Sequence, residues 1–156
     1  ESWLCDALER LDPARPVVVE AESSKVGARS VPPRLWAAMR TAPRIGLAAS
    51  VAARAAFSAR AYAATAADHE ALERAFVRMP RHVSKATLAE WRGLAAAADH
   101  IALAAALIET HYDPAYRRSG GEAERAATVD VGDLSDAALE AAADAVATMT
   151  ASLPKG

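Results

Sequence analysis

Two acidic side chains that follow a run of valines are the residues in this sequence best suited to chemistry. Glu20 and Glu22 stand two positions apart, directly after Val17–Val19. Residues two apart on a strand point to the same side. Paired carboxylates there would hold Mg²⁺ through water or act as a general base. On the residues alone, an equal alternative is that one glutamate caps a turn or pairs with Lys25 or Arg29.

The element that must position these carboxylates is a buried strand. An unbroken β-branched run after a proline, here residues 17–21, is typical of a strand buried on both faces. Hydroxyls, cations and a glycine then follow: Ser23, Ser24, Lys25, Gly27, Arg29 and Ser30. Ligands of open α/β sheets bind just past the carboxyl ends of strands. The sequence therefore predicts a site immediately after this strand.

A second polar segment covers residues 111–122 and contains an Asp-Pro step, which predicts a turn. Its adjacent arginines, Arg117 and Arg118, suit phosphate because guanidinium forks match phosphate oxygens. Composition alone favours a different interpretation, in which the segment is a solvated connector. Its tyrosines, Tyr112 and Tyr116, would then lie against neighbouring helices.

The remaining pattern predicts a helix-rich α/β domain with a partial parallel sheet of about three short strands, at residues 17–21, 44–48 and 127–131. Ser50 and Ser135 are predicted to cap the helices after the second and third strands. The middle third predicts three helices, the first capped by Asp68, the second capped by Ser84 and the third running from about Asp99 to Thr110. They are predicted to pack as a helical subdomain with Trp91 as a core anchor. No domain boundary is visible between residues 1 and 156.

Composition narrows the functional classes. The chain has 156 residues, 53% of them hydrophobic but only 5% aromatic, so alanine supplies much of the apolar content of one core. The net charge of −2 gives no overall basic field for nucleic acid, which leaves a local basic patch as the alternative. The single cysteine, Cys5, excludes an internal disulfide, fits a cytoplasmic setting and is predicted to be a small core residue. No stretch predicts a membrane span, and the histidines lack metal-ligand spacing.

A phosphate cradle of the form G-x-x-x-x-G-K-S/T does not occur in the sequence. The chain also begins with Glu1, inside a helical pattern that runs to Leu11. The simplest interpretation is that the chain is the carboxyl-terminal piece of a longer protein.

Two motifs carry a family resemblance. Residues 19–27 read Val-Glu-Ala-Glu-Ser-Ser-Lys-Val-Gly and resemble the E-x-E-S-x-x-I-G region of bacterial tRNA 2-selenouridine synthases. Residues 111–119 read His-Tyr-Asp-Pro-Ala-Tyr-Arg-Arg-Ser and resemble the family's H-Y-D-P-x-Y-x-x-S segment. Weaker similarity surrounds Arg54 and Tyr62. The resemblance implies that residues 1–156 are the later part of a P-loop domain, without the preceding rhodanese-like domain and Walker A segment.

The resemblance also implies an activity. The family converts the wobble 2-thiouridine of certain tRNAs to 2-selenouridine, first attaching a geranyl group from geranyl diphosphate and then using selenophosphate. It implies tRNA, through its anticodon region, as the partner. The resemblance implies no tightly bound cofactor, although the site could also use Mg²⁺. This piece of the enzyme alone is expected not to catalyse the reaction. The alternatives are a non-catalytic helical module that binds RNA or protein, and a different P-loop transferase.

The matched positions receive roles only through the resemblance. Glu20 and Glu22 would be catalytic, organising a metal ion or water. The residues that would bind substrate, phosphate or tRNA are Ser23, Lys25, Gly27, His111, Asp113, Tyr116, Arg117, Arg118 and Ser119. Val26 replaces the usual isoleucine, and Ser24 stands where relatives often have a basic residue, which places one anion or RNA contact in doubt.

Overall fold

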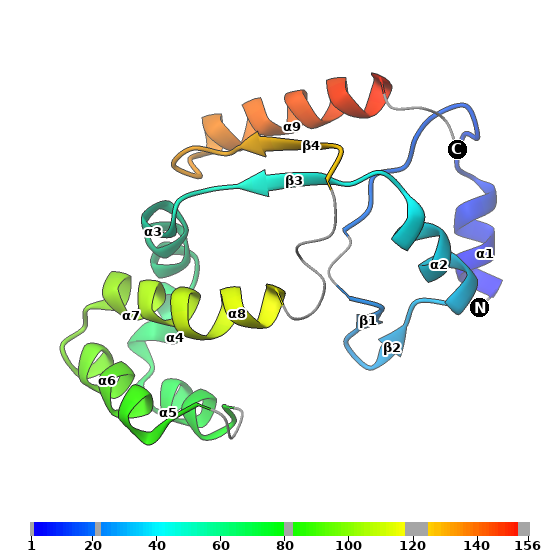
Figure 1. Ribbon diagram of the computed structural model, residues 1–156. Helices are drawn as coiled ribbons and strands as arrows, with labels where there is room; N and C mark the ends of the chain where they lie inside the picture. The colour runs from blue at the N-terminus through cyan, green and yellow to red at the C-terminus, as the bar shows by residue number, and fades with distance from the viewer. Residues whose placement is uncertain (1, 21–22, 80–82, 118–124, 153–156) are drawn as a thin grey trace.

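The computed structural model describes residues 2–20, 23–79, 83–117 and 125–152. Figure 1 shows a helix-rich chain with one short parallel sheet and a separate group of helices beside it. This arrangement confirms the predicted helix-rich α/β class with a packed helical subdomain. Within the described ranges, no helix is both long enough and apolar enough to cross a membrane.

The parallel sheet consists of β3 (Ile45–Ala48) and β4 (Ala127–Asp130), with Ile45 opposite Ala127 and Ala48 opposite Asp130. The intervening chain is the crossover, and it contains the whole helical subdomain. Helix α9 (Asp136–Ser152) covers one face of this sheet (Figure 1). Val129, Val131 and Ala142 form the core between the helix and the sheet. Two of the predicted strands are therefore confirmed, and they lie side by side.

The predicted strand over residues 17–21 is wrong for the part that the structure describes. Residues 16–20 are irregular, and Val17, Val18 and Val19 are 54%, 65% and 53% exposed. A β-branched run favours extended backbone, but a buried strand also needs a pairing partner and a layer on each face. In the described sheets β3 pairs with β4, and β1 (Lys25–Val26) pairs with β2 (Arg29–Ser30), so neither pair includes the valine run.

The segment after residue 22 forms a small exposed hairpin. The sequence predicts instead that it follows the carboxyl end of a buried strand. Strands β1 (Lys25–Val26) and β2 (Arg29–Ser30) pair antiparallel across a two-residue turn. Gly27 has φ +60° at the first turn position, where a type II′ hairpin turn favours glycine. Helix α2 (Pro33–Thr41) follows, with its proline in the first turn.

The first helix, α1 (Ser2–Glu9), contributes little to the core. Cys5 is exposed, which contradicts its predicted place in the core. Trp3, Leu8 and Leu11 are exposed as well. The apolar spacing of this helix therefore identifies a helix correctly, but it does not identify a buried face among the described residues.

The helical subdomain is built from α5 (His69–Val77), α6 (Lys85–Ala96) and α7 (His100–Leu107), which follow α3 (Val51–Ala61) and the short α4 (Ala63–Ala67). Its buried centre is Phe76, Trp91 and Leu103. Trp91 is fully buried, and its ring centroid lies 6.1 Å from that of Phe76. The predicted helical bundle and its tryptophan anchor are confirmed.

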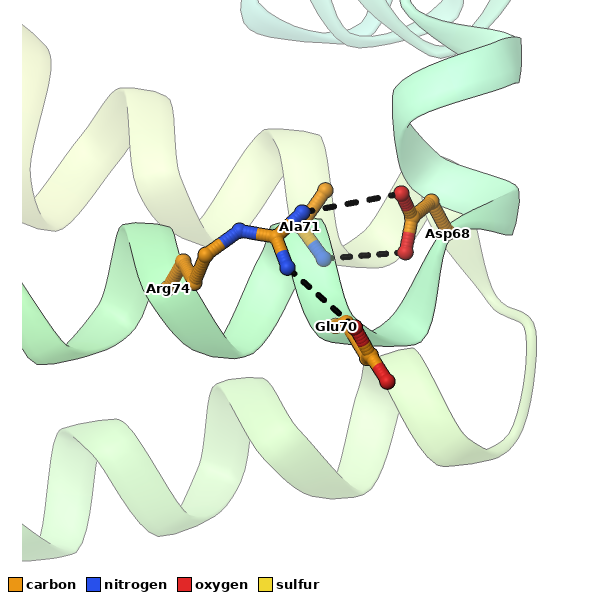
Figure 2. A network of polar contacts seen from close by, with 4 residues as sticks. All are labelled: Asp68, Glu70, Ala71 and Arg74. Carbon is orange, nitrogen blue, oxygen red and sulfur yellow. Dashed lines mark hydrogen bonds and ion pairs between the residues drawn. The ribbon is translucent and has the colours of Figure 1, made fainter.

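Side-chain caps begin these helices, and those at Asp68 and Ser84 are the ones that the sequence predicts. Figure 2 shows the start of α5, where Asp68 accepts a hydrogen bond from the Ala71 N–H at 3.0 Å. Arg74 contacts both Asp68 and Glu70 on the same surface. The hydroxyl of Ser84 and the carboxylate of Asp99 cap α6 and α7 in the same way. Each cap satisfies an amide that the first helical turn leaves without a partner.

Candidate functional site

The main polar contact between distant segments is an ion pair from Arg54 to Asp113. Arg54 donates from Nη1 to Oδ1 at 2.7 Å and from Nη2 to Oδ2 at 2.9 Å. The side chains are 34% and 27% exposed, so the pair is partly screened by solvent. Two parallel hydrogen bonds fix the orientation of both planar groups.

The sequence around β3 explains the position of Arg54. Ser50 follows the strand and its hydroxyl accepts the Ala53 N–H at 3.1 Å, which starts α3. Arg54 therefore lies in the first turns of α3, just beyond the carboxyl end of β3. This is the edge of a parallel sheet at which ligands bind in α/β proteins.

Asp113 is positioned by a change of helical type. After α7, residues Ile108–Tyr112 form a π-helix, η1, and Asp113–Tyr116 continue as α8. Pro114 cannot donate an N–H and would clash with the carbonyl four residues earlier in a regular α-helix. The wider π turn accommodates the proline without ending the helix. The turn predicted at Asp113-Pro114 is thus wrong, because the helical path continues through it.

Electrostatics keep both members of the pair charged. The hydrogen bond from Arg54 holds the pKa of Asp113 below its ordinary value, against the opposing effect of burial. The charges of Arg54 and Arg117 lower the pKa of Asp113 further. In turn, the hydrogen bond to Asp113 raises the pKa of Arg54. Arg117, one turn along from Asp113, therefore adds a second cation to this edge.

The other described residues of the 111–119 motif divide between the core and the surface. The ring of His111 packs edge-on at 6.4 Å from Trp91 and at 5.1 Å from Tyr112. Tyr112 and Tyr116 are exposed. Arg118 and Ser119 lie outside the described residues. The structure thus directs His111 toward the helical subdomain and leaves the Tyr116 side chain partly exposed at the surface.

The first motif is not joined to a buried strand. Glu20 is exposed in the irregular 16–20 segment, and Glu22 lies outside the described residues. The hydroxyl of Ser23 accepts the Lys25 N–H at 3.0 Å, and Gly27 makes the hairpin turn. These contacts explain the local shape of the motif. The catalytic and phosphate-binding roles of these residues stay predictions.

The described ranges contain no group of three or more His, Cys, Asp or Glu side chains able to hold a metal ion. The Arg54–Asp113 edge suits an anion, because Arg54 and Arg117 supply positive charge there. The ion pair with Asp113 fixes the position of the Arg54 side chain.

The sequence alone predicts no role for Arg54 beyond its weak family similarity. A signal was present, because Arg54 is the first cation of a helix that otherwise begins Val-Ala-Ala and continues Ala-Ala-Phe. A charge in so apolar a context needs a partner when it is partly buried. The sequence could not show that the partner lies 59 residues away.

Comparisons with known proteins bear on the first half of the chain. A family model described as the tRNA 2-selenouridine synthase AAA domain matches residues 2–83. The match includes the Glu20–Gly27 motif and Arg54, and it ends before the 111–119 motif. No curated protein and no solved structure matches the chain significantly. Because the matched region spans more than half of the sequence, this chain belongs to the family of tRNA 2-selenouridine synthase AAA domains.

Proposed function

We propose that this chain acts in a cytoplasmic enzyme that converts the wobble 2-thiouridine of tRNA to 2-selenouridine. The observation that carries the proposal is the family match over residues 2–83. In this reaction, geranyl diphosphate first alkylates the sulfur of the thiouridine and releases diphosphate. The selenium of selenophosphate then attacks the carbon that bears the sulfur and expels geranyl thiolate. Water cleaves the remaining selenium–phosphorus bond, which releases phosphate and leaves 2-selenouridine.

The charged residues would have two different roles, in which the cations bind phosphate and the glutamates position water or Mg²⁺. Arg117 and Arg118 would hold the phosphates of tRNA or of geranyl diphosphate, because Asp113 and Arg54 fix the helix on which the cationic run begins. Lys25 would add a phosphate contact from the hairpin. Glu20 and Glu22 would position water or Mg²⁺ during substitution at the thiouridine. The guanidinium groups of Arg117 and Arg118 suit phosphate binding, because they bind phosphate oxygens bidentately at any physiological pH.

The direct test is the formation of 2-selenouridine by the enzyme that carries this chain. The enzyme is incubated with thiolated tRNA, geranyl diphosphate and selenophosphate, and nucleosides from the digested tRNA are analysed by mass spectrometry. Reversing the charges with R117E/R118E should abolish product formation and weaken tRNA binding, with a shallower dependence on salt. The matched control is R15E/R78E, which reverses two exposed arginines elsewhere.

Two outcomes would reject the proposal or part of it. Binding of tRNA without any selenouridine would favour the non-catalytic RNA-binding module over the enzyme. Equal activity of R117E/R118E and R15E/R78E would remove Arg117 and Arg118 from the site while leaving the reaction itself intact.

A further inference from the structure

A basic hollow lies at the amino ends of the two parallel strands, away from the Arg54–Asp113 pair. Its volume is about 380 Å³, and its lining residues are Arg40, Thr41, Ala42, Pro43, Arg44, Arg125 and Ala126. Arg44 directly precedes β3, and Ala126 directly precedes β4. Because the strands are parallel, the segments that enter them meet at one edge of the sheet.

The backbone at this edge is well fixed. The carbonyl of Arg44 accepts the N–H of Ala126 at 2.8 Å, which extends the ladder by one step. Arg125 lies across β3 at Gly46, and a Cβ added to Gly46 would overlap Cδ of Arg125. The absence of a side chain at Gly46 is therefore what allows the Arg125 side chain to lie over the strand.

Positive charge is concentrated among the described residues that line this hollow. Three of the seven lining residues are arginines, and none is acidic. In the described part of the chain, neither Arg40 nor Arg44 forms an ion pair with a carboxylate. Arg40 and Arg44 therefore bring two guanidinium groups into one hollow, and their combined positive potential favours an anion. The chain as a whole is slightly acidic, which makes the concentration of arginines a local feature.

The surroundings favour a phosphodiester over a compact diphosphate. The hollow is open, since all its lining residues except Arg44 are exposed. Helix α2 ends at the hollow with Thr41, and the carboxyl end of a helix carries partial negative charge. The lining contains neither a glycine-rich loop nor a helix amino terminus, which are the features that cradle a diphosphate. A singly charged backbone phosphate suits this balance better than a multiply charged small ligand.

We propose that the hollow formed by Arg40, Arg44 and Arg125 binds a backbone phosphate of tRNA. This inference rests on the proposed function for the identity of the RNA. It gives the tRNA a contact at the amino ends of the parallel strands, in addition to the contact proposed for Arg117.

The test measures binding of a fluorescent tRNA with a wobble uridine to the enzyme that carries this chain by anisotropy, over a series of salt concentrations. Arg44→Gln should weaken binding by roughly tenfold and reduce the salt slope by about one. Arg40→Gln should act in the same direction. Arg78→Gln removes the same charge from the exposed end of α5 and should leave both quantities near those of the unaltered chain. Thermal unfolding of each variant shows that the fold is retained.

The proposal is overturned if Arg44→Gln binds tRNA as well as Arg78→Gln does, or if the unaltered enzyme does not bind tRNA. A second titration with pyrophosphate separates the two sources of phosphate. Loss of pyrophosphate binding in Arg44→Gln with unchanged tRNA binding would make the hollow a small-ligand site and also overturn the proposal. Selenouridine formation is scored separately, so a failure of this inference and a failure of the proposed reaction are distinguishable.

Discussion

Arg54 and Asp113 join two segments 59 residues apart through a pair of parallel hydrogen bonds, 2.7 and 2.9 Å long. Arg54 belongs to the region matched by the family model, whereas Asp113 belongs to the motif downstream of it. The contact therefore ties the carboxyl edge of β3 to the helix that carries Arg117. Four predictions follow from this pair, from the caps and from the basic hollow.

The coupling between Arg54 and Asp113 should be measurable in a double-mutant cycle of Arg54→Gln and Asp113→Asn. We expect a coupling free energy of about 1 kcal/mol from urea unfolding, discounted for the partial exposure of both groups. Arg54→Lys should lose most of it, because an ammonium cannot form the two parallel bonds. The more exposed Arg92–Glu73 pair is the matched control and should show a smaller coupling. Equal coupling in the two pairs would contradict a special role for Arg54.

The stability of the fold should depend on pH through Asp113. Its pKa is lowered in the folded state, so its stabilising effect is present above the unfolded-state value, about pH 4, and is lost as the pH falls through the folded-state value. Asp113→Asn should therefore flatten the decline of unfolding free energy below about pH 4. Glu73 and Asp133 also have lowered pKa values, so the variant should keep part of the decline. An unchanged acid profile in Asp113→Asn would count against the ion pair.

The cap at the start of α5 should contribute more to stability than the ion pair beside it. Asp68→Ala removes the acceptor of the Ala71 N–H and should cost about 1 kcal/mol in chemical denaturation. Glu70→Ala removes only the exposed contact with Arg74, 3.3 Å long, and should cost less than about 0.5 kcal/mol. Figure 2 shows that the two substitutions affect neighbouring positions of one network. A larger loss in Glu70→Ala would reverse this assignment.

Gly46→Ala tests the geometry of the basic hollow without changing its charge. The new methyl group would overlap the Arg125 side chain and displace it from β3, while alanine itself fits a strand. We expect tRNA affinity to fall by about threefold, less than for Arg44→Gln. Gly93→Ala is the control, because a Cβ there meets no atom within 4 Å. Equal affinity in the two variants would show that the placement of Arg125 does not matter for binding.

The sequence by itself determined the elements whose signals are local. The caps at Ser50, Asp68 and Ser84 each depend on one side chain and an amide three residues away, and the structure confirms them. The helical subdomain around Trp91 follows from apolar spacing over single helices. The family resemblance was likewise readable from short motifs, and the match over residues 2–83 confirms it.

Only the tertiary structure decided the features that need a partner from elsewhere in the chain. The valine run has strong local preference for extended backbone, yet it is exposed and unpaired within the described ranges because pairing is not a local property. The Asp-Pro step broke the expected helical pattern, but a π turn absorbed the proline and brought Asp113 to Arg54. The basic hollow exists because two parallel strands begin at the same edge, which places Arg44 beside residues some 80 positions later in the chain.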